Sequence, residues 1–315
     1  MNNLKKVGLT ALAGALVSFS ANAAELTVTG GASIGFTGEE KVDTGNGWSM
    51  NDGLTFAATT ELDNGMTVTA TQIIDSSDGA AGAIMDTRTL KIDMGDNGVL
   101  TFAGTGGSSV LNAVDDTTPT AYEESWDVVS SASAIPGGTG GDNMFHYSNS
   151  SLMDGVKLSA SYTPSSGGTA SIESSSDYGV EYTGIDGLTV GIAMGENNLK
   201  AATLDLTSMY ARYAMDAFTV GITTSESDSE ATDADKEFTA MGISYAVSEE
   251  LSVSLNTSTI DYEDSTLSDQ DATGISMSYV MGSMTFKAAR NDVANIAGSA
   301  NADRSAYDLS LAFAF

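Results

Sequence analysis

Few side chains of this 315-residue chain could act as a nucleophile, a general base or a soft metal ligand. The sequence contains no cysteine and one histidine, His146, which is followed by Ser148 and Asn149. A thiolate site, a histidine-rich metal centre and a Ser-His-Asp triad therefore lack their parts. We expect no catalytic residue, no cofactor and no metal site, and we interpret His146 as a polar residue of a strand.

Carboxylates are the abundant reactive groups of the chain. There are 42 Asp and Glu against 12 Lys and Arg, and the formal net charge is −30. Such a charge repels phosphate backbones, so nucleic acid is excluded as a partner. The hydrophobic content of 41% is too high for a disordered acidic chain. A folded framework must therefore carry these carboxylates, and their simplest chemistry is electrostatic attraction of cations.

The acids are concentrated, without any Lys or Arg nearby, in a long connection over residues 104–141. This segment lies between two predicted strands, Val99–Ala103 and Asn143–Ser148, and it also holds apolar residues that include Trp126. A structureless loop of this length is usually functional or disordered, and the apolar content argues against disorder. We expect the segment to fold inward and to line a constriction; an external loop with a solvated acidic face stays open as the alternative. Its five candidate constriction residues are Asp115, Asp116, Glu123, Glu124 and Asp127.

Alternation of apolar and small or polar residues continues along almost the whole chain. Residues 188–195, 218–223, 251–256 and 306–315 all follow this period of two. The pattern is typical of antiparallel strands with one wet face, whereas no convincing helical period follows the N-terminal segment. The sequence therefore predicts an all-β protein.

Turn signals count the strands. Seven short turns, from Asp63-Asn64-Gly65 to Met281-Gly282-Ser283, recur every 30 to 33 residues except for one step of 57. They join fourteen strands, and Leu26–Thr37 and Arg304–Phe315 add two more. Longer polar connections, such as Thr224–Lys236 and Tyr262–Ala272, separate the turns. An even number of strands with short turns on one side and long loops on the other predicts a 16-stranded antiparallel transmembrane β-barrel.

A barrel of this size is too wide for side chains to fill, so we expect its apolar face to contact lipid and its polar face to line water. Four tyrosines on the apolar face, each just before a short turn, predict an aromatic girdle: Tyr182, Tyr213, Tyr245 and Tyr279. The charges of the opposite face are predicted to line the lumen wall: Lys91, Asp93, Lys157, Asp177, Glu181, Arg212, Lys287, Arg304 and Asp308.

Residues 1–23 have the organisation of a secretory signal. Lys5 and Lys6 precede a short apolar run, and Ala21-Asn22-Ala23 forms a small-x-small cleavage site. We therefore expect a signal peptide over residues 1–23 and a transmembrane barrel over residues 24–315.

The signal, the sixteen alternating strands, the long acidic third loop and the terminal Phe315 together resemble the general porins of Gram-negative bacteria. The openings of the whole chain, Met1-Asn2-Asn3-Leu4-Lys5-Lys6, and of the expected barrel, Glu25-Leu26-Thr27-Val28-Thr29-Gly30-Gly31, are similar to alphaproteobacterial porins of the Rhodobacter type. The resemblance implies a homotrimer in the outer membrane whose third loop narrows the channel. It also implies that the outer-membrane assembly machinery reads Phe315.

In that family the acids of the third loop face a basic cluster on the wall, and here the chain departs. Its first three strands contain no Lys or Arg, and the four basic residues Lys91, Arg212, Lys287 and Arg304 are scattered. We expect a porin for passive diffusion of ions and small hydrophilic solutes, with moderate cation selectivity. A substrate-specific channel and a non-conducting surface or adhesin barrel stay open as alternatives, as do isolated Ca²⁺ sites among the acidic loops.

Overall fold

The computed structural model of the chain describes residues 25–42, 45–75, 85–115, 117–134, 141–165, 172–199 and 203–315. The predicted signal peptide lies outside these residues. The strands are β1 (Glu25–Glu39), β2 (Trp48–Glu61), β3 (Thr67–Asp75), β4 (Met85–Asp93), β5 (Val99–Thr105), β6 (Met144–Met153), β7 (Val156–Thr163), β8 (Ile172–Ile185), β9 (Leu188–Leu199), β10 (Thr203–Met215), β11 (Phe218–Ser229), β12 (Lys236–Ala246), β13 (Leu251–Tyr262), β14 (Gln270–Met281), β15 (Met284–Ala294) and β16 (Arg304–Ala314).

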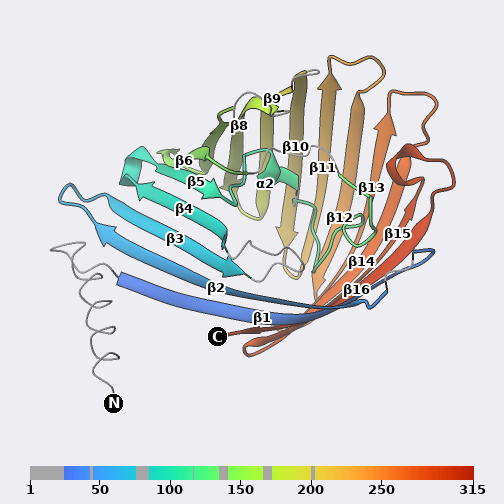
Figure 1. Ribbon diagram of the computed structural model, residues 1–315, viewed down its shortest axis with the longest axis horizontal. Coiled ribbons are helices and arrows are strands. Elements are labelled where there is room, and N and C mark those ends of the chain that lie inside the picture. Colours follow the sequence, from blue (N-terminus) through green and yellow to red (C-terminus); the bar gives the residue numbers. More distant parts are fainter. Residues whose placement is uncertain are drawn as a thin grey trace, which may run out of the picture.

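The strands form one closed antiparallel barrel in which each strand pairs with its neighbours in sequence (Figure 1). β1 pairs with β16 and closes the ring. At this seam the Gly30 N–H donates to the Phe315 carbonyl at 2.8 Å, and the Phe315 N–H donates to the Gly30 carbonyl at 2.9 Å. The predicted 16-stranded antiparallel barrel is therefore confirmed.

The short helical elements lie in connections between strands. They are the helix α2 (Asn112–Asp115) and the 3-10 turns η1 (Gly95–Asn97) and η2 (Ile296–Gly298). None of the helices in the described part of the chain is long and apolar enough to cross a membrane.

The two faces of the wall differ as the alternation predicts. Along β13, Ser254, Asn256 and Ser258 are buried, whereas Val253 and Leu255, which alternate with them, are exposed. Side chains of a strand alternate between the faces of its sheet. Because a closed barrel of sixteen strands is too wide for its side chains to fill, the exposed apolar face lies outside and the polar face lies inside.

The four tyrosines of the predicted girdle lie on the outer face, one in each of four hairpins. Tyr213, Tyr245 and Tyr279 are between 37% and 44% exposed, and Tyr182 is partly exposed. Tyr245 stacks on Phe218 with a distance of 4.4 Å between ring centroids. The four rings thus take equivalent places on the outer face.

Two connections are shorter than the sequence predicts, because the strands continue beyond the apolar pattern. β11 extends to Ser229 and β12 begins at Lys236, so the loop predicted over Thr224–Lys236 is wrong in extent. The loop predicted over Tyr262–Ala272 is also shorter in the structure, since β13 ends at Tyr262 and β14 begins at Gln270. The added strand ends carry carboxylates outward, and cross-strand partners there include Glu226 with Glu237. At these strand ends the alternation of apolar residues stops, but the backbones of neighbouring strands remain paired.

Candidate functional site

The connection between β5 and β6 packs along the inner face of the wall. At its start the Val110 N–H donates to Ser161 Oγ of β7 at 3.0 Å. Farther on, the Ala121 N–H donates to Ser254 Oγ of β13 at 3.0 Å. At its end the Ser130 hydroxyl donates to Glu39 of β1 at 3.1 Å. The segment therefore crosses from β7, over the later strands, to the seam of the barrel.

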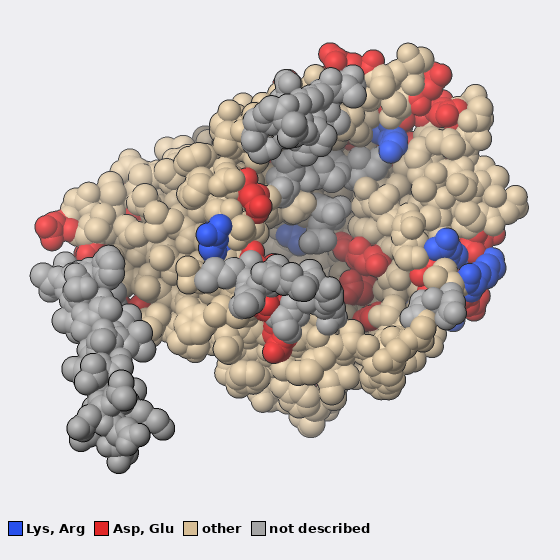
Figure 2. Space-filling model, viewed as in Figure 1, with Lys and Arg blue, Asp and Glu red and all other residues tan. Residues whose placement is uncertain are grey.

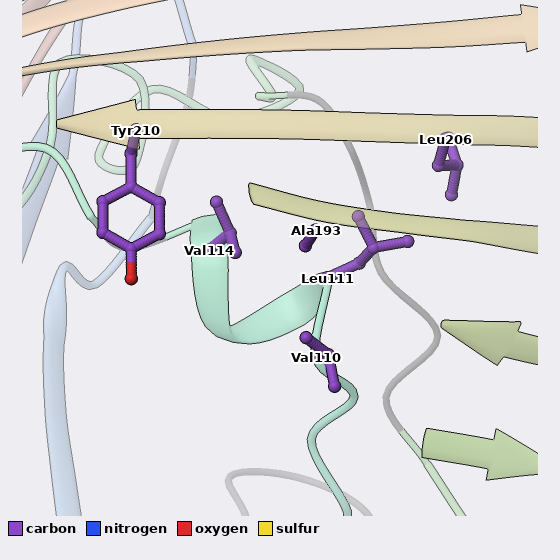
Figure 3. Close-up of a cluster of buried hydrophobic side chains, with 6 residues drawn as sticks. All are labelled: Val110, Leu111, Val114, Ala193, Leu206 and Tyr210. Carbon is purple, nitrogen blue, oxygen red and sulfur yellow. The ribbon is translucent and has the colours of Figure 1, made fainter. Parts of the chain in front are cut away.

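Three apolar clusters join this segment to the wall. The first is shown in Figure 3, where α2 and the residues before it turn apolar side chains toward β9 and β10. Its members are Val110, Leu111, Val114, Ala193, Leu206 and Tyr210. Burial of each large apolar side chain stabilises this contact by about 1.5–3 kcal/mol.

The second and third clusters lie under the later part of the segment. Trp126 is 4% exposed and meets Phe238 of β12 edge-on, with 5.2 Å between ring centroids. Val129 is packed with Val293 of β15 and Ala306 of β16. Apolar contacts thus hold both ends of the segment, although neither Phe238 nor Val293 belongs to the outer apolar face.

Asp177 of β8 fixes the N-terminal end of the segment. The side chain is 3% exposed, and its Oδ2 accepts the Leu111 N–H at 3.1 Å. Ser161 of β7 donates its hydroxyl to the other carboxylate oxygen. A buried carboxylate is stable when hydrogen-bond donors surround it, so the predicted wall charge Asp177 serves as an anchor for the loop.

A polar cluster centres on Tyr122 in the middle of the segment. The Tyr122 hydroxyl donates to Asp308 Oδ2 at 2.8 Å, and Thr37 donates to Asp308 Oδ1 at 2.6 Å. Lys287 Nζ lies 4.8 Å from the centroid of the Tyr122 ring. Burial raises the pKa of Tyr122, and the hydrogen bond to Asp308 raises it further. Two predicted wall charges of opposite sign, Lys287 and Asp308, therefore meet at one loop residue.

The five predicted constriction acids have different environments. Glu124 is 4% exposed, and its carbonyl accepts a hydrogen bond from Asn291 of β15. Asp127 is exposed and accepts the Glu124 N–H at 2.8 Å. Glu123 is partly exposed beside the Tyr122 cluster. Asp115 ends α2, and Asp116 lies outside the described residues. Glu123 and Asp127 are thus the acids whose described side chains remain open to solvent.

The remaining wall charges are distributed around the barrel. Lys91 of β4 and Lys157 of β7 are exposed, and Asp93 accepts the N–H of Gly95 at the turn after β4. Glu181 accepts the Tyr210 hydroxyl at 2.5 Å, and the Arg212 guanidinium lies 5.7 Å from the centroid of that ring.

Arg304 forms a clasp at the seam. Its Nη1 donates to Glu39 Oε1 at 3.1 Å and to Ser130 Oγ at 3.0 Å. The Glu39 side chain is 4% exposed, so this ion pair is largely shielded from water on the acidic side. Arg304 therefore links the closing strands of the barrel to the end of the loop.

Sequence reasoning missed four residues that organise the site: Glu39, Tyr122, Tyr210 and Asn291. Glu39 lies just beyond the predicted first strand, yet it continues the inward parity of Thr37. That parity was the available signal. Tyr122 and Asn291 are recognisable only by their partners, because neither residue type nor spacing distinguishes them from other polar residues of the chain.

Figure 2 shows the molecule hollowed near its centre, with Asp and Glu and also Lys and Arg visible inside the hollow. Within the described ranges, no group of three or more His, Asp or Glu side chains is placed to hold a metal ion. His146 Nδ1 is buried and makes no hydrogen bond within those ranges. The described geometry therefore presents distributed charges along a polar passage.

The sequence matches the Gram-negative porin family over residues 8–268. A substituted porin of Rhodobacter blastica is similar in structure, with 17% identity, a TM-score of 0.68, and coverage of 92% of this chain and 100% of that chain. An anion-selective porin from Comamonas acidovorans is similar with 12% identity, a TM-score of 0.72, and coverage of 93% and 100%. No curated protein matches the sequence.

Proposed function

Because this chain belongs to the Gram-negative porin family, we propose that it is an outer-membrane channel whose third loop, the connection between β5 and β6, narrows the path for diffusing solutes. The solutes are ions and small hydrophilic molecules that cross passively. The observation that carries the proposal is the attachment of the loop to the inner wall at Asp177, Trp126 and Arg304. A loop that is attached to the wall at three places stays in the lumen.

The channel prefers cations in this proposal. Among the loop acids with described side chains, Glu123 and Asp127 are the open ones. The charge of Asp308 acts on Glu123, whereas Lys287 is engaged at Tyr122. Carboxylates near a narrow passage lower the energy of cations there. One structural neighbour is an anion-selective porin, so the sign of selectivity must come from such residues and not from the fold. Lys91 and Lys157 oppose the acids, which keeps the preference moderate.

The channel is a homotrimer in this proposal. The outer face of β3 and β4 carries exposed Gln72 and Arg88, which are cross-strand partners beside apolar Ala70 and Leu90. They line an outer groove of about 920 Å³ together with Phe56, Leu90 and Phe102. An outward Arg is costly against lipid, so a second copy of the chain is the partner that suits this face.

Export and insertion complete the proposal. Residues 1–23 act as a cleaved signal peptide, and the assembly machinery reads Phe315. Phe315 is 73% exposed, and its backbone forms the last hydrogen bonds of the seam. An exposed aromatic side chain beside the closing seam is accessible to a protein that inserts the barrel.

Planar-bilayer recording of the purified chain tests this function. We expect steps of constant conductance that neutral sugars reduce only below a cut-off size. Current block that saturates with one solute class would instead indicate a substrate-specific channel. A correctly folded barrel that produces no conductance would overturn the proposal and favour a structural or adhesive role.

A further inference from the structure

Five inward glycines lie under the loop, each on a different strand of β8–β14. An ideal Cβ built on each would approach a loop atom to between 2.5 and 2.8 Å. The strands and glycines are β8 with Gly179, β9 with Gly195, β11 with Gly221, β12 with Gly242 and β14 with Gly274. Side-chain carbons essentially never come so close to their neighbours, so the loop fits only where these side chains are absent.

The contacts differ along the loop. At Gly179 the Cβ would meet Val110 Cγ1 at 2.5 Å, and at Gly221 it would meet Pro119 Cδ at 2.7 Å. At Gly274 it would lie 2.8 Å from Ser125 Cα, which is backbone and cannot rotate away.

Hydroxyl groups of the same wall hold the loop between the glycines. Thr223 lies 2.9 Å from Thr117, measured between the hydroxyl oxygens, and Ser276 accepts the Tyr122 N–H at 3.0 Å. Ser258 lies 3.0 Å from Ser125, again between hydroxyl oxygens. Glycines determine how closely the loop approaches, and hydroxyls determine its position along the wall. We call the five glycines with Thr223, Ser254, Ser258 and Ser276 the loop seat.

We propose that the loop seat sets the free cross-section of the channel by fixing the depth at which the loop lies against the wall. The inference rests on the proposed diffusion function and assigns positioning roles to wall residues that contact the loop. A protein interior is close-packed, so even one added methyl group must displace its neighbour. A displaced loop moves away from β8–β14 and into the passage, which lowers the conductance.

A double-mutant cycle on Gly221 and Pro119 tests the seat. Gly221→Ala should lower the single-channel conductance, and Pro119→Ala should remove the ring atoms that the new methyl group meets. The double variant should then conduct like Pro119→Ala alone. Gly53→Ala is the matched control: Gly53 lies on the inner face of β2, and its Cβ would lie 3.7 Å from its nearest contact, the Ile74 carbonyl oxygen.

If Gly221→Ala conducts like the wild type, the proposal is wrong. It is also wrong if Gly221→Ala lowers the conductance by the same factor whether or not Pro119→Ala is present. Both results require a wild-type protein that conducts. A wild-type barrel that carries no current would instead show that the proposed diffusion function is wrong. Heat-modifiable migration of every variant confirms that the barrel has closed.

A disulfide cross-link between loop and wall tests the proposal without any glycine substitution. The chain has no cysteine, so Ser125→Cys with Ser258→Cys introduces a single pair at hydroxyls 3.0 Å apart. We expect the pair to oxidise and the conductance to remain that of the reduced form. A pair that stays reduced, or an oxidised form with altered conductance, would show that the conducting loop lies elsewhere and would overturn the proposal.

Discussion

The wall under the described part of the loop and the wall of β2–β5 are built from different residues. Under the loop, inward positions are glycines, small hydroxyl residues and large apolar anchors such as Phe238 and Ile260. On β2–β5 they include the hydrogen-bonded pair Thr59 and Thr69, together with exposed Lys91. One part of the barrel is shaped to receive its own chain, and the other part carries polar and charged inward side chains. The same strand pattern therefore serves two purposes.

Excision of residues 110–135 would break this comparison most strongly. Without the segment, the covered wall becomes lumen, and we expect a large rise in single-channel conductance and passage of larger neutral sugars. Apolar Phe238 and Ile260 would then face water, so the stability of the folded barrel should fall as well. Conductance that stays at the wild-type value would show that the segment does not obstruct the passage.

Trp126→Ala should produce the next largest effect. Removal of a buried Trp side chain costs about 3–5 kcal/mol, and here that loss weakens loop attachment more than strand pairing. We expect excess current noise from a loop that leaves the wall and returns. The other tryptophan, Trp48, is 63% exposed on the outer face, so Trp48→Ala is the matched control. Equal current noise in both variants would show that Trp126 does not hold the loop against the wall.

The barrel itself is predictable from sequence, because turn spacing and alternation act locally. Asp63-Asn64-Gly65 falls between β2 and β3 as expected, and Arg304 begins the last strand. Strand ends such as Ser225–Ser229 escape prediction because their outward residues are acidic. Loop contacts escape it for another reason: Asp177 and Leu111 are 66 positions apart, and nothing in a period of two records which inward residue a distant loop will reach.

Neutralising acids of the loop should have a smaller effect, a change in ion selectivity. Glu123→Gln with Asp127→Asn should shift the reversal potential across a KCl gradient toward anions, because both acids are on the open side of the loop. Glu237→Gln with Asp261→Asn is the control, since these acids lie on the outer face of β12 and β13. The shift should shrink in about 1 M salt, where the Debye length is about 3 Å. Equal shifts in both variants would place the selective charge outside the passage.

The smallest expected effect is the response of Glu123 to pH. Burial raises the pKa of this carboxyl above its ordinary value, and the charges of Asp127 and Asp308 raise it further, while Tyr122 and Lys287 oppose them. Glu123 therefore takes up its proton at a higher pH than an ordinary carboxyl group does, because burial disfavours the charged form.

The sign of the linkage follows from that direction. A raised pKa means that the docked loop holds the proton more tightly than the free loop does, so docking is most stable at low pH and weakens as the pH rises through the raised pKa. Current noise from loop motion should therefore grow between acid and neutral pH, and cation selectivity should grow with the carboxylate charge. Glu123→Gln should remove the part of both changes that lies above the range of ordinary carboxyl groups. If the wild type and Glu123→Gln follow the same pH profile, the titrating group lies elsewhere on the loop or the wall.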